Sequence, residues 1–372
     1  MSITNTASYN GSAAYAGDTV ASQHRAVKIW FYTVAVLIAI MVLVGGATRL
    51  TDSGLSITEW APVSGIIPPI THEQWLEEFA KYQTTDEFKY QNSTMTLLQF
   101  EFIFWWEWGH RFLGRLIGLA VLLPMIWFWV RGRMPEGFGI PSLVLFAGIC
   151  VQGAIGWWMV KSGLVDRVDV SQIRLAVHLT LACIIFAYTV WLARSLGTHT
   201  SAGLPTQSWQ GGALVVLVLS QTFLGGLVAG LDAGMAYNTW PTMNGDWMPQ
   251  AVWAITPAWK NFVDNAVMVQ FVHRTSAYFV LAAFILHAVW LMRIDADSLH
   301  ARRAVLLVGL IVAQACVGII TLVLQVPISW ALVHQFGGVV ILAFATAHWR
   351  ALALSSGTAS ARSAQITNTV RA

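Results

Sequence analysis

The sequence predicts an all-α integral membrane protein with eight transmembrane helices, arranged as two pseudo-equivalent four-helix bundles. Hydrophobic residues make up 56% of the 372 residues and charged residues only 10%, whereas soluble domains carry roughly 25% charged residues. Eight apolar stretches have the length of about 20 residues that crosses a bilayer as a helix, and the first four resemble the last four. The net charge of +3 is too small, and its charges too dispersed, to suggest a nucleic-acid partner, and none is expected.

The expected spans follow one another with short connections, except for two long loops. They lie at 29–49, 101–130, 140–160, 173–193, 211–231, 268–292, 304–325 and 329–349. Basic residues favour the cytoplasmic side of a membrane, and they gather at the N-terminus, the C-terminus and the short connections on the same side. We therefore expect a bacterial cytoplasmic (inner) membrane protein with both termini cytoplasmic and the loops 50–100 and 232–267 outside.

The first and last four spans are predicted to be an internal repeat. The segment "GGATRLTDSGLSITEWAPVSG" (45–65) aligns without a gap on "GGLVAGLDAGMAYNTWPTMNG" (225–245). This gives an N-terminal bundle over 29–194 and a C-terminal bundle over 211–350. An N-terminal tail (1–28), a linker (195–210) and a disordered polar tail (351–372) complete the chain, all cytoplasmic.

Each half contributes one histidine from its second span and one from its fourth. His110 aligns with His273 and His178 with His334, and the depth of all four places them toward the outer side of the membrane. Two neutral imidazoles that face a bundle interior are what a six-coordinate haem iron requires, whereas zinc needs further ligands. The pattern predicts one haem per half; for any single histidine, an interhelical hydrogen bond is the alternative.

A second ligand pattern is open within the C-terminal half. His287 follows His273 and His348 follows His334 at the same spacing, so this half alone could hold two stacked haems. The first half carries Pro124 and Leu192 at the corresponding positions, which favours one haem per half. The role of His287 and His348 is left undecided.

Arg111 and Arg274 directly follow His110 and His273, and Arg174 lies one helical turn before His178. Haem propionates near an outer surface need cationic partners, so these arginines are candidate clamps. Snorkelling toward the membrane surface is the alternative for each of them.

Glu107 lies three residues before His110 and therefore on the same helix face. Its repeat counterpart is Gln270, so the first half has an ionisable group where the second has an amide. This difference predicts chemistry in the first half and a structural or electron-carrying haem in the second. The alternative is an ion pair of Glu107 with Arg111 or Arg115.

The first outer loop is predicted to contain an amphipathic helix. The segment "THEQWLEEFAKY" (71–82) opens with a Thr71/Gln74 capping box and then places Trp75, Phe79 and Tyr82 on one face. That face either covers the haem site or anchors the loop at the lipid headgroups.

Several of these motifs together resemble haem A synthase. The similarity rests on "GGATRLTDSGLSITEWAPVSGIIPP" (45–69), "EFIFWWEWGHRFLGR" (101–115), the "AVHLT" histidine and "NTWPTMNGDW" followed by "VHRTSAY", and is closest to the mitochondrial and alphaproteobacterial type. The resemblance implies two four-helix bundles and oxidation of the C8 methyl group of haem O to the formyl group of haem A. It implies that His110 and His178 ligate the substrate haem, that Glu107 is catalytic, and that His273 and His334 hold a haem b cofactor.

Two other functions fit the histidine pattern. One is a diheme b-type electron-transfer cytochrome, and the other is a haem transporter or assembly factor. The Glu107/Gln270 difference separates them from the enzyme, because electron transfer gives no reason for a carboxylate in one half only. For the enzyme we expect haem O, its supplying farnesyltransferase, an electron acceptor of unknown identity and membrane lipid as partners, and leave a homo-oligomer open.

Overall fold

The computed structural model describes residues 8–165, 168–196 and 208–370, and its regular structure there is helical apart from one isolated bridge between Met243 and Asp246. Eight of these helices are long and apolar enough to cross a membrane, which confirms the eight expected spans and a multi-pass membrane protein. They are α1 (Ser8–Leu50), α4 (Leu97–Val130), α5 (Gly139–Gly163), α6 (Gln172–Ser195), α7 (Ser208–Gly230), α9 (Ala266–Ile294), α10 (Leu299–Val323) and α11 (Ile328–Val370). Most of the expected linker 195–210 lies outside the described residues.

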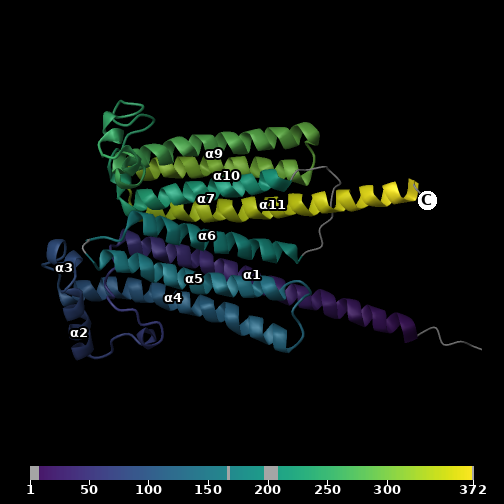
Figure 1. The fold of residues 1–372 in the computed structure, drawn as a ribbon, viewed down its shortest axis with the longest axis horizontal. Helices are drawn as coiled ribbons and strands as arrows, with labels where there is room; N and C mark the ends of the chain where they lie inside the picture. Colours follow the sequence, from purple (N-terminus) through teal and green to yellow (C-terminus); the bar gives the residue numbers. More distant parts are fainter. Residues whose placement is uncertain (1–7, 166–167, 197–207, 371–372) are drawn as a thin grey trace, which may run out of the picture.

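The eight long helices run side by side in two groups (Figure 1). In the first half, α1 and α5 each pack against α4 and α6; in the second half, α7 and α10 each pack against α9 and α11. The two halves meet where α6 contacts α7 and α11, and where α1 contacts α11. This arrangement agrees with the two bundles expected from the sequence, and their equivalence stays a prediction.

The two ends of the helices differ in what they carry (Figure 1). One end, here called the loop end, carries the segments that follow α1 and α7. These contain η1 (Ser64–Ile66), α2 (His72–Tyr82), α3 (Asp86–Tyr90), η2 (Ala233–Met235), η3 (Gln250–Trp253), η4 (Ala258–Lys260) and α8 (Asn261–Asp264). The other end, the tail end, carries the start of α1 and the end of α11.

The tail end is more helical than the sequence suggested. α1 already begins at Ser8, and α11 continues beyond its apolar part, which ends at Leu354, as far as Val370. A disordered tail was expected after residue 350, and this expectation was wrong for the described residues. The segment contains no proline, and adding residues to an existing helix costs far less than starting one.

The predicted amphipathic helix is α2, and it packs on the extension of α4 at the loop end. The Thr71/Gln74 capping box is present as expected. The ring centroids of Trp75 and Phe104 are 5.0 Å apart. The ring centroid of Phe100 lies 5.1 Å from that of Phe79 and 5.3 Å from that of Tyr82. Since Tyr82 and Phe100 are fully buried, this face is occupied by α4 rather than by lipid headgroups.

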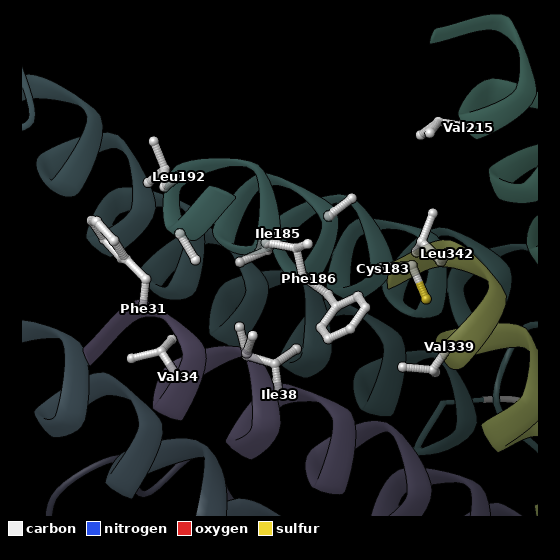
Figure 2. Packing of buried hydrophobic residues seen from close by; sticks show 14 of the residues in the cluster. Phe31, Val34, Ile38, Cys183, Ile185, Phe186, Leu192, Val215, Val339 and Leu342 are labelled. Carbon is white, nitrogen blue, oxygen red and sulfur yellow. The ribbon is translucent and has the colours of Figure 1, made fainter. Parts of the chain in front are cut away.

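A hydrophobic core fills the seam between the two halves (Figure 2). It contains Phe31, Val34 and Ile38 from α1, Cys183, Ile185 and Phe186 from α6, Val215 from α7, and Val339 and Leu342 from α11. The seam is therefore packed like a protein interior, and the two halves hold a fixed relation to each other.

Candidate functional site

Each of the four predicted histidine ligands lies against a glycine of a neighbouring helix, near the loop end. A Cβ atom built on Gly45 would lie 3.0 Å from His110 Nε2, and one on Gly225 would lie 3.3 Å from His273 Cε1. The corresponding distances are 2.9 Å from Gly156 to His178 Cε1 and 2.7 Å from Gly318 to His334 Cε1. Glycine is thus what lets each imidazole enter the space between two helices.

The repeat carries a pair of adjacent glycines in each half, and the two glycines of a pair make room for different neighbours. Gly45 faces His110 of its own half, whereas a Cβ on Gly46 would collide with Gln335 of α11. In the second half Gly225 faces His273, and a Cβ on Gly226 would lie 2.7 Å from the Cα of Ala176 in α6. The first glycine of each pair therefore makes room for a histidine, and the second lets the two halves approach.

His273 and His334 face one another across the second half. Their ring centroids are 6.5 Å apart and the ring planes are inclined by 78°. A metal between two histidines needs bonds of about 2 Å on each side, plus roughly 1 Å from each nitrogen to its ring centre. The separation of the two rings fits one iron ion between them.

Glutamine side chains hold three of the four histidines, one for each. Gln314 Nε2 donates to the His334 carbonyl at 2.7 Å and lies 3.2 Å from His334 Nδ1. Gln221 Nε2 makes the same contacts with His273, at 2.9 and 3.2 Å. An amide nitrogen can only donate, so Nδ1 is the acceptor in both contacts, and each glutamine fixes the orientation of the ring beside it.

In the first half only one of the two histidines is held in this way. Gln152 Nε2 donates to the His178 carbonyl at 3.0 Å and lies 3.1 Å from Nδ1 and 3.4 Å from Nε2 of that ring. No described residue hydrogen-bonds to the His110 ring. The His110 ring lies against Gly45 of α1 and the His178 ring against Gly156 of α5, and within the described chain the two rings make no contact like that of His273 and His334.

Glu107 is buried, with 3% of its surface exposed, and it joins α4 to the loop after α1. Its Oε2 accepts hydrogen bonds from Ser56 Oγ at 2.7 Å and from the Ile57 amide at 2.8 Å. Its Oε1 accepts from Arg111, with the closest contact at 2.6 Å from Nη2. The ion pair considered as an alternative is therefore present with Arg111. Arg115 instead donates to the carbonyls of the loop.

Gln270 occupies the matching place in the second half with different chemistry. Its Nε2 donates to the carbonyl of Tyr237, the repeat counterpart of Ile57, at 3.0 Å. Its Oε1 is buried and has no hydrogen-bond partner among the described residues. Where the first half has Ser56, the second has Ala236. Only the first half therefore combines a carboxylate with donors that hold it.

The three predicted arginine clamps all bind backbone carbonyls near the loop end. Arg111 donates to Ile57 and Glu59, and Arg174 donates to the Trp158 carbonyl while its guanidinium lies 4.6 Å from the Trp158 ring centre. Arg274 donates to the carbonyls of Thr239, Pro241 and Thr242 through Nη2. Its Nη1 is buried without a partner among the described residues, so Arg274 keeps a donor that a propionate could use.

The inner histidines make a direct contact with each other. His287 Nε2 and His348 Nε2 are 2.9 Å apart, and both residues are buried. An iron between them needs the two nitrogens about 4 Å apart. The observed pair is a hydrogen bond, which disfavours the stacked-haem alternative.

The loop end also buries a carboxyl group that the sequence did not single out. Glu87 in α3 is 3% exposed, and its Oε2 has no hydrogen-bond partner among the described residues. Burial raises the pKa of Glu87 to about 8, and the negative charges of Glu107, Asp169 and Asp52 add to this. Its place in a polar segment, "TTDEFKY", gave no sign of burial.

Other supporting residues also escaped the sequence analysis, namely Gln221, Ser56 and the ion pair of Arg49 with Asp232. Gln221 could have been found, since it lies one helical turn before Gly225 on the face that meets His273. Ser56 and Asp232 lie in irregular loops, where spacing gives no register.

Comparison with known proteins gives consistent matches. Residues 28–346 match the family model COX15-CtaA, described as cytochrome oxidase assembly protein. The chain is 53% identical over 326 residues to a protein named heme A synthase from Chelativorans sp. (strain BNC1), covering 87% of this chain and 90% of the relative. It is 49% identical over 328 residues to one of that name from Rhizobium meliloti (strain 1021), covering 88% and 89%. A third, from Brucella ovis, is 50% identical over 329 residues, covering 88% and 92%.

Proposed function

Because the chain belongs to the cytochrome oxidase assembly protein family COX15-CtaA and is an enzyme of haem A synthesis, we propose that its two halves have different tasks. The first half binds haem O as substrate between His110 and His178, and there the C8 methyl group becomes a formyl group. The second half holds haem b as a resident cofactor between His273 and His334.

The observation that carries this proposal is the difference between Glu107 and Gln270. Both side chains reach the equivalent backbone position of the loop, Ile57 in one half and Tyr237 in the other. The carboxylate accepts a hydrogen bond there, whereas the amide donates one. A side chain needed only to anchor the loop could be an amide in both halves, so the carboxylate has a further task.

That task is proton transfer at the edge of the substrate. Conversion of a methyl group to a formyl group with oxygen from water releases four electrons and four protons per molecule. Glu107 lies one turn from His110 on the same helix, where a carboxylate can accept protons from the methyl group or from an attacking water. Arg111 keeps it oriented, and its negative charge stabilises positive charge that develops on the substrate macrocycle.

The second half fits a resident haem b. His273 and His334 would be the iron ligands, and the free Nη1 of Arg274 would pair with a propionate. Bound haem b would supply one-electron transfer between the substrate half and an external acceptor. Gln221 and Gln314 hold both ligands in place, as a cofactor that stays bound requires.

The remaining assignments follow from the charge distribution and the substrate. The protein resides in the bacterial inner membrane with both termini cytoplasmic and the loop end, with its haem sites, toward the periplasm. In the first half Arg111 and Arg174 face the propionates of haem O. The partners are the farnesyltransferase that supplies haem O and an electron acceptor.

The test is the substitution Glu107→Gln, followed by chromatography of the haems extracted from cells and from purified protein. We expect bound haem to be retained, with haem O or a hydroxymethyl intermediate in place of haem A. Ser56→Ala is the matched control, because it removes one hydrogen bond to the same carboxylate and keeps the charge. Haem A production at the wild-type rate in Glu107→Gln would overturn the catalytic assignment, and an equal loss in Ser56→Ala would show that anchoring, not chemistry, is the task of Glu107.

A further inference from the structure

We propose that His110 is the exchangeable ligand of the substrate haem, and that Met41 and Leu113 make it exchangeable by leaving its ring without a hydrogen-bonding partner among the residues that the structure describes. This inference rests on the proposed function, which places the substrate in the first half. It concerns a property that the four histidines do not share.

The two haem sites face different demands. A substrate haem must enter and leave in every catalytic cycle, whereas a cofactor haem stays. Two firmly oriented imidazoles suit the cofactor, because they hold the iron from both sides. In the substrate site, two such ligands would slow both loading and release, so one ligand that lets go easily serves turnover.

In the second half a polar network holds His273. Gln221 contacts both the carbonyl and Nδ1 of His273 through its Nε2. Ser276 Oγ donates to Gln221 Oε1 at 2.5 Å and lies 3.1 Å from the His273 carbonyl. The glutamine is thus itself fixed, and with it the ring.

The first half has apolar side chains at both of these places. Gln221 precedes Gly225 by one turn, and the residue that precedes Gly45 by one turn is Met41. Ser276 follows His273 by three residues, and the residue that follows His110 by three is Leu113. The Met41 Cε lies 3.3 Å from the Cβ position of Gly114, so Met41 fills the space beside the turn that carries His110.

The result is a site with one held ligand and one free ligand. Met41 and Leu113 both pack against the main hydrophobic core, and neither can replace the hydrogen bonds that Gln221 and Ser276 supply. The opposite ligand, His178, is held by Gln152. The asymmetry therefore lies within the substrate site as well as between the two sites.

The experiment transfers the polar network into the first half with the double substitution Met41→Gln and Leu113→Ser in the full-length protein, reconstituted with haem O. Two quantities are measured besides activity: the rate at which haem O passes to excess apomyoglobin, and the rate at which the ferrous haem O site binds carbon monoxide. We expect both rates to fall by tenfold or more, while the content and spectrum of haem b stay unchanged. Unchanged rates in a variant that retains haem b would overturn the proposal.

The reverse double substitution, Gln221→Met with Ser276→Leu, gives an independent test should the first variant fail to fold. It should make haem b reactive toward carbon monoxide and transferable to apomyoglobin, and an inert haem b would contradict the proposal. His110→Ala should keep five-coordinate haem O on His178, whereas His178→Ala should lose it; the opposite order would assign the free ligand to His178. If haem O binding depends on neither histidine, the proposed function itself fails.

Discussion

Arg49 and Asp232 form an ion pair of 2.8 Å that joins the end of α1 to the turn after α7. The other terminal nitrogen of Arg49 contacts Asp52 at 2.7 Å. Asp52 and Asp232 are matched by the internal repeat, and both have positive φ values, 48° and 47°, a conformation that aspartate tolerates better than most residues. One arginine therefore binds two equivalent turns, and by doing so connects the two halves at the loop end.

Replacement of Arg49 by methionine should loosen this connection. The arginine side chain is 14% exposed but both aspartates are about two-thirds exposed. We therefore expect the free energy of unfolding to fall by about 1–2 kcal/mol, between the value of an exposed ion pair and that of a buried hydrogen bond to a charged group. Thermal unfolding in detergent measures it. Asp52→Asn is the control, since it removes the local pair and keeps the one between halves; an equal loss in both variants would contradict a role for Arg49 in joining the halves.

Alanine at Gly318 should displace the haem b ligand His334. The new Cβ would lie 2.7 Å from His334 Cε1, closer than real Cβ contacts, and the ring is held by Gln314 and cannot easily move aside. We expect the haem b content per protein to fall severalfold, measured by the pyridine haemochrome spectrum. Gly309→Ala on the same helix, where nothing lies within 4 Å of the new Cβ, should leave the haem content unchanged. Full haem b occupancy in Gly318→Ala would show that His334 is not a ligand in the observed position.

The long helices could be predicted from the sequence because membrane spans depend on length and composition alone. The histidines could be placed because the repeat supplied two copies of one pattern. The arginines were only partly understood: Arg111 and Arg274 were expected to face propionates, yet most of their donors hold loop carbonyls. Such contacts depend on how an irregular loop folds back over the helices, and no periodicity in the sequence encodes that path.

The pH dependence of stability should contain a contribution from Glu87. Its pKa is raised from 4.5 to about 8 in the folded protein, so the folded state binds a proton that the unfolded state has already lost. The free energy of unfolding should therefore fall as pH rises from about 4.5 to about 8. Glu87→Gln should remove this fall, as measured by thermal unfolding at several pH values. A variant with the same pH dependence as the wild type would exclude Glu87 as its source.

Reporter fusions should place the tail end in the cytoplasm. The start of α1 and the end of α11 lie at the same end of the helices as the α4–α5 connection, which carries Arg131 and Arg133, and the start of α10, which carries Arg302 and Arg303 (Figure 1). Basic residues favour the cytoplasmic side. A fluorescent protein fused after Ala372 should fluoresce, and alkaline phosphatase inserted after Ser93 should be active. The reverse result would put the haem sites near the cytoplasmic face.

Substitution of the inner histidines should affect stability and leave haem binding intact. The His287 and His348 nitrogens are 2.9 Å apart and both side chains are buried, so either single change to alanine leaves a buried imidazole without this partner. That costs about 1–3 kcal/mol, visible as a lower unfolding temperature, and the double variant should lose less than the sum of the two single variants because both break the same bond. His334→Ala is the control that should lose haem b while keeping this hydrogen bond. If His287→Ala and His348→Ala instead each remove one haem while His110 and His178 prove dispensable for haem binding, the second half holds two stacked haems, and the division of the protein into a substrate half and a cofactor half is wrong.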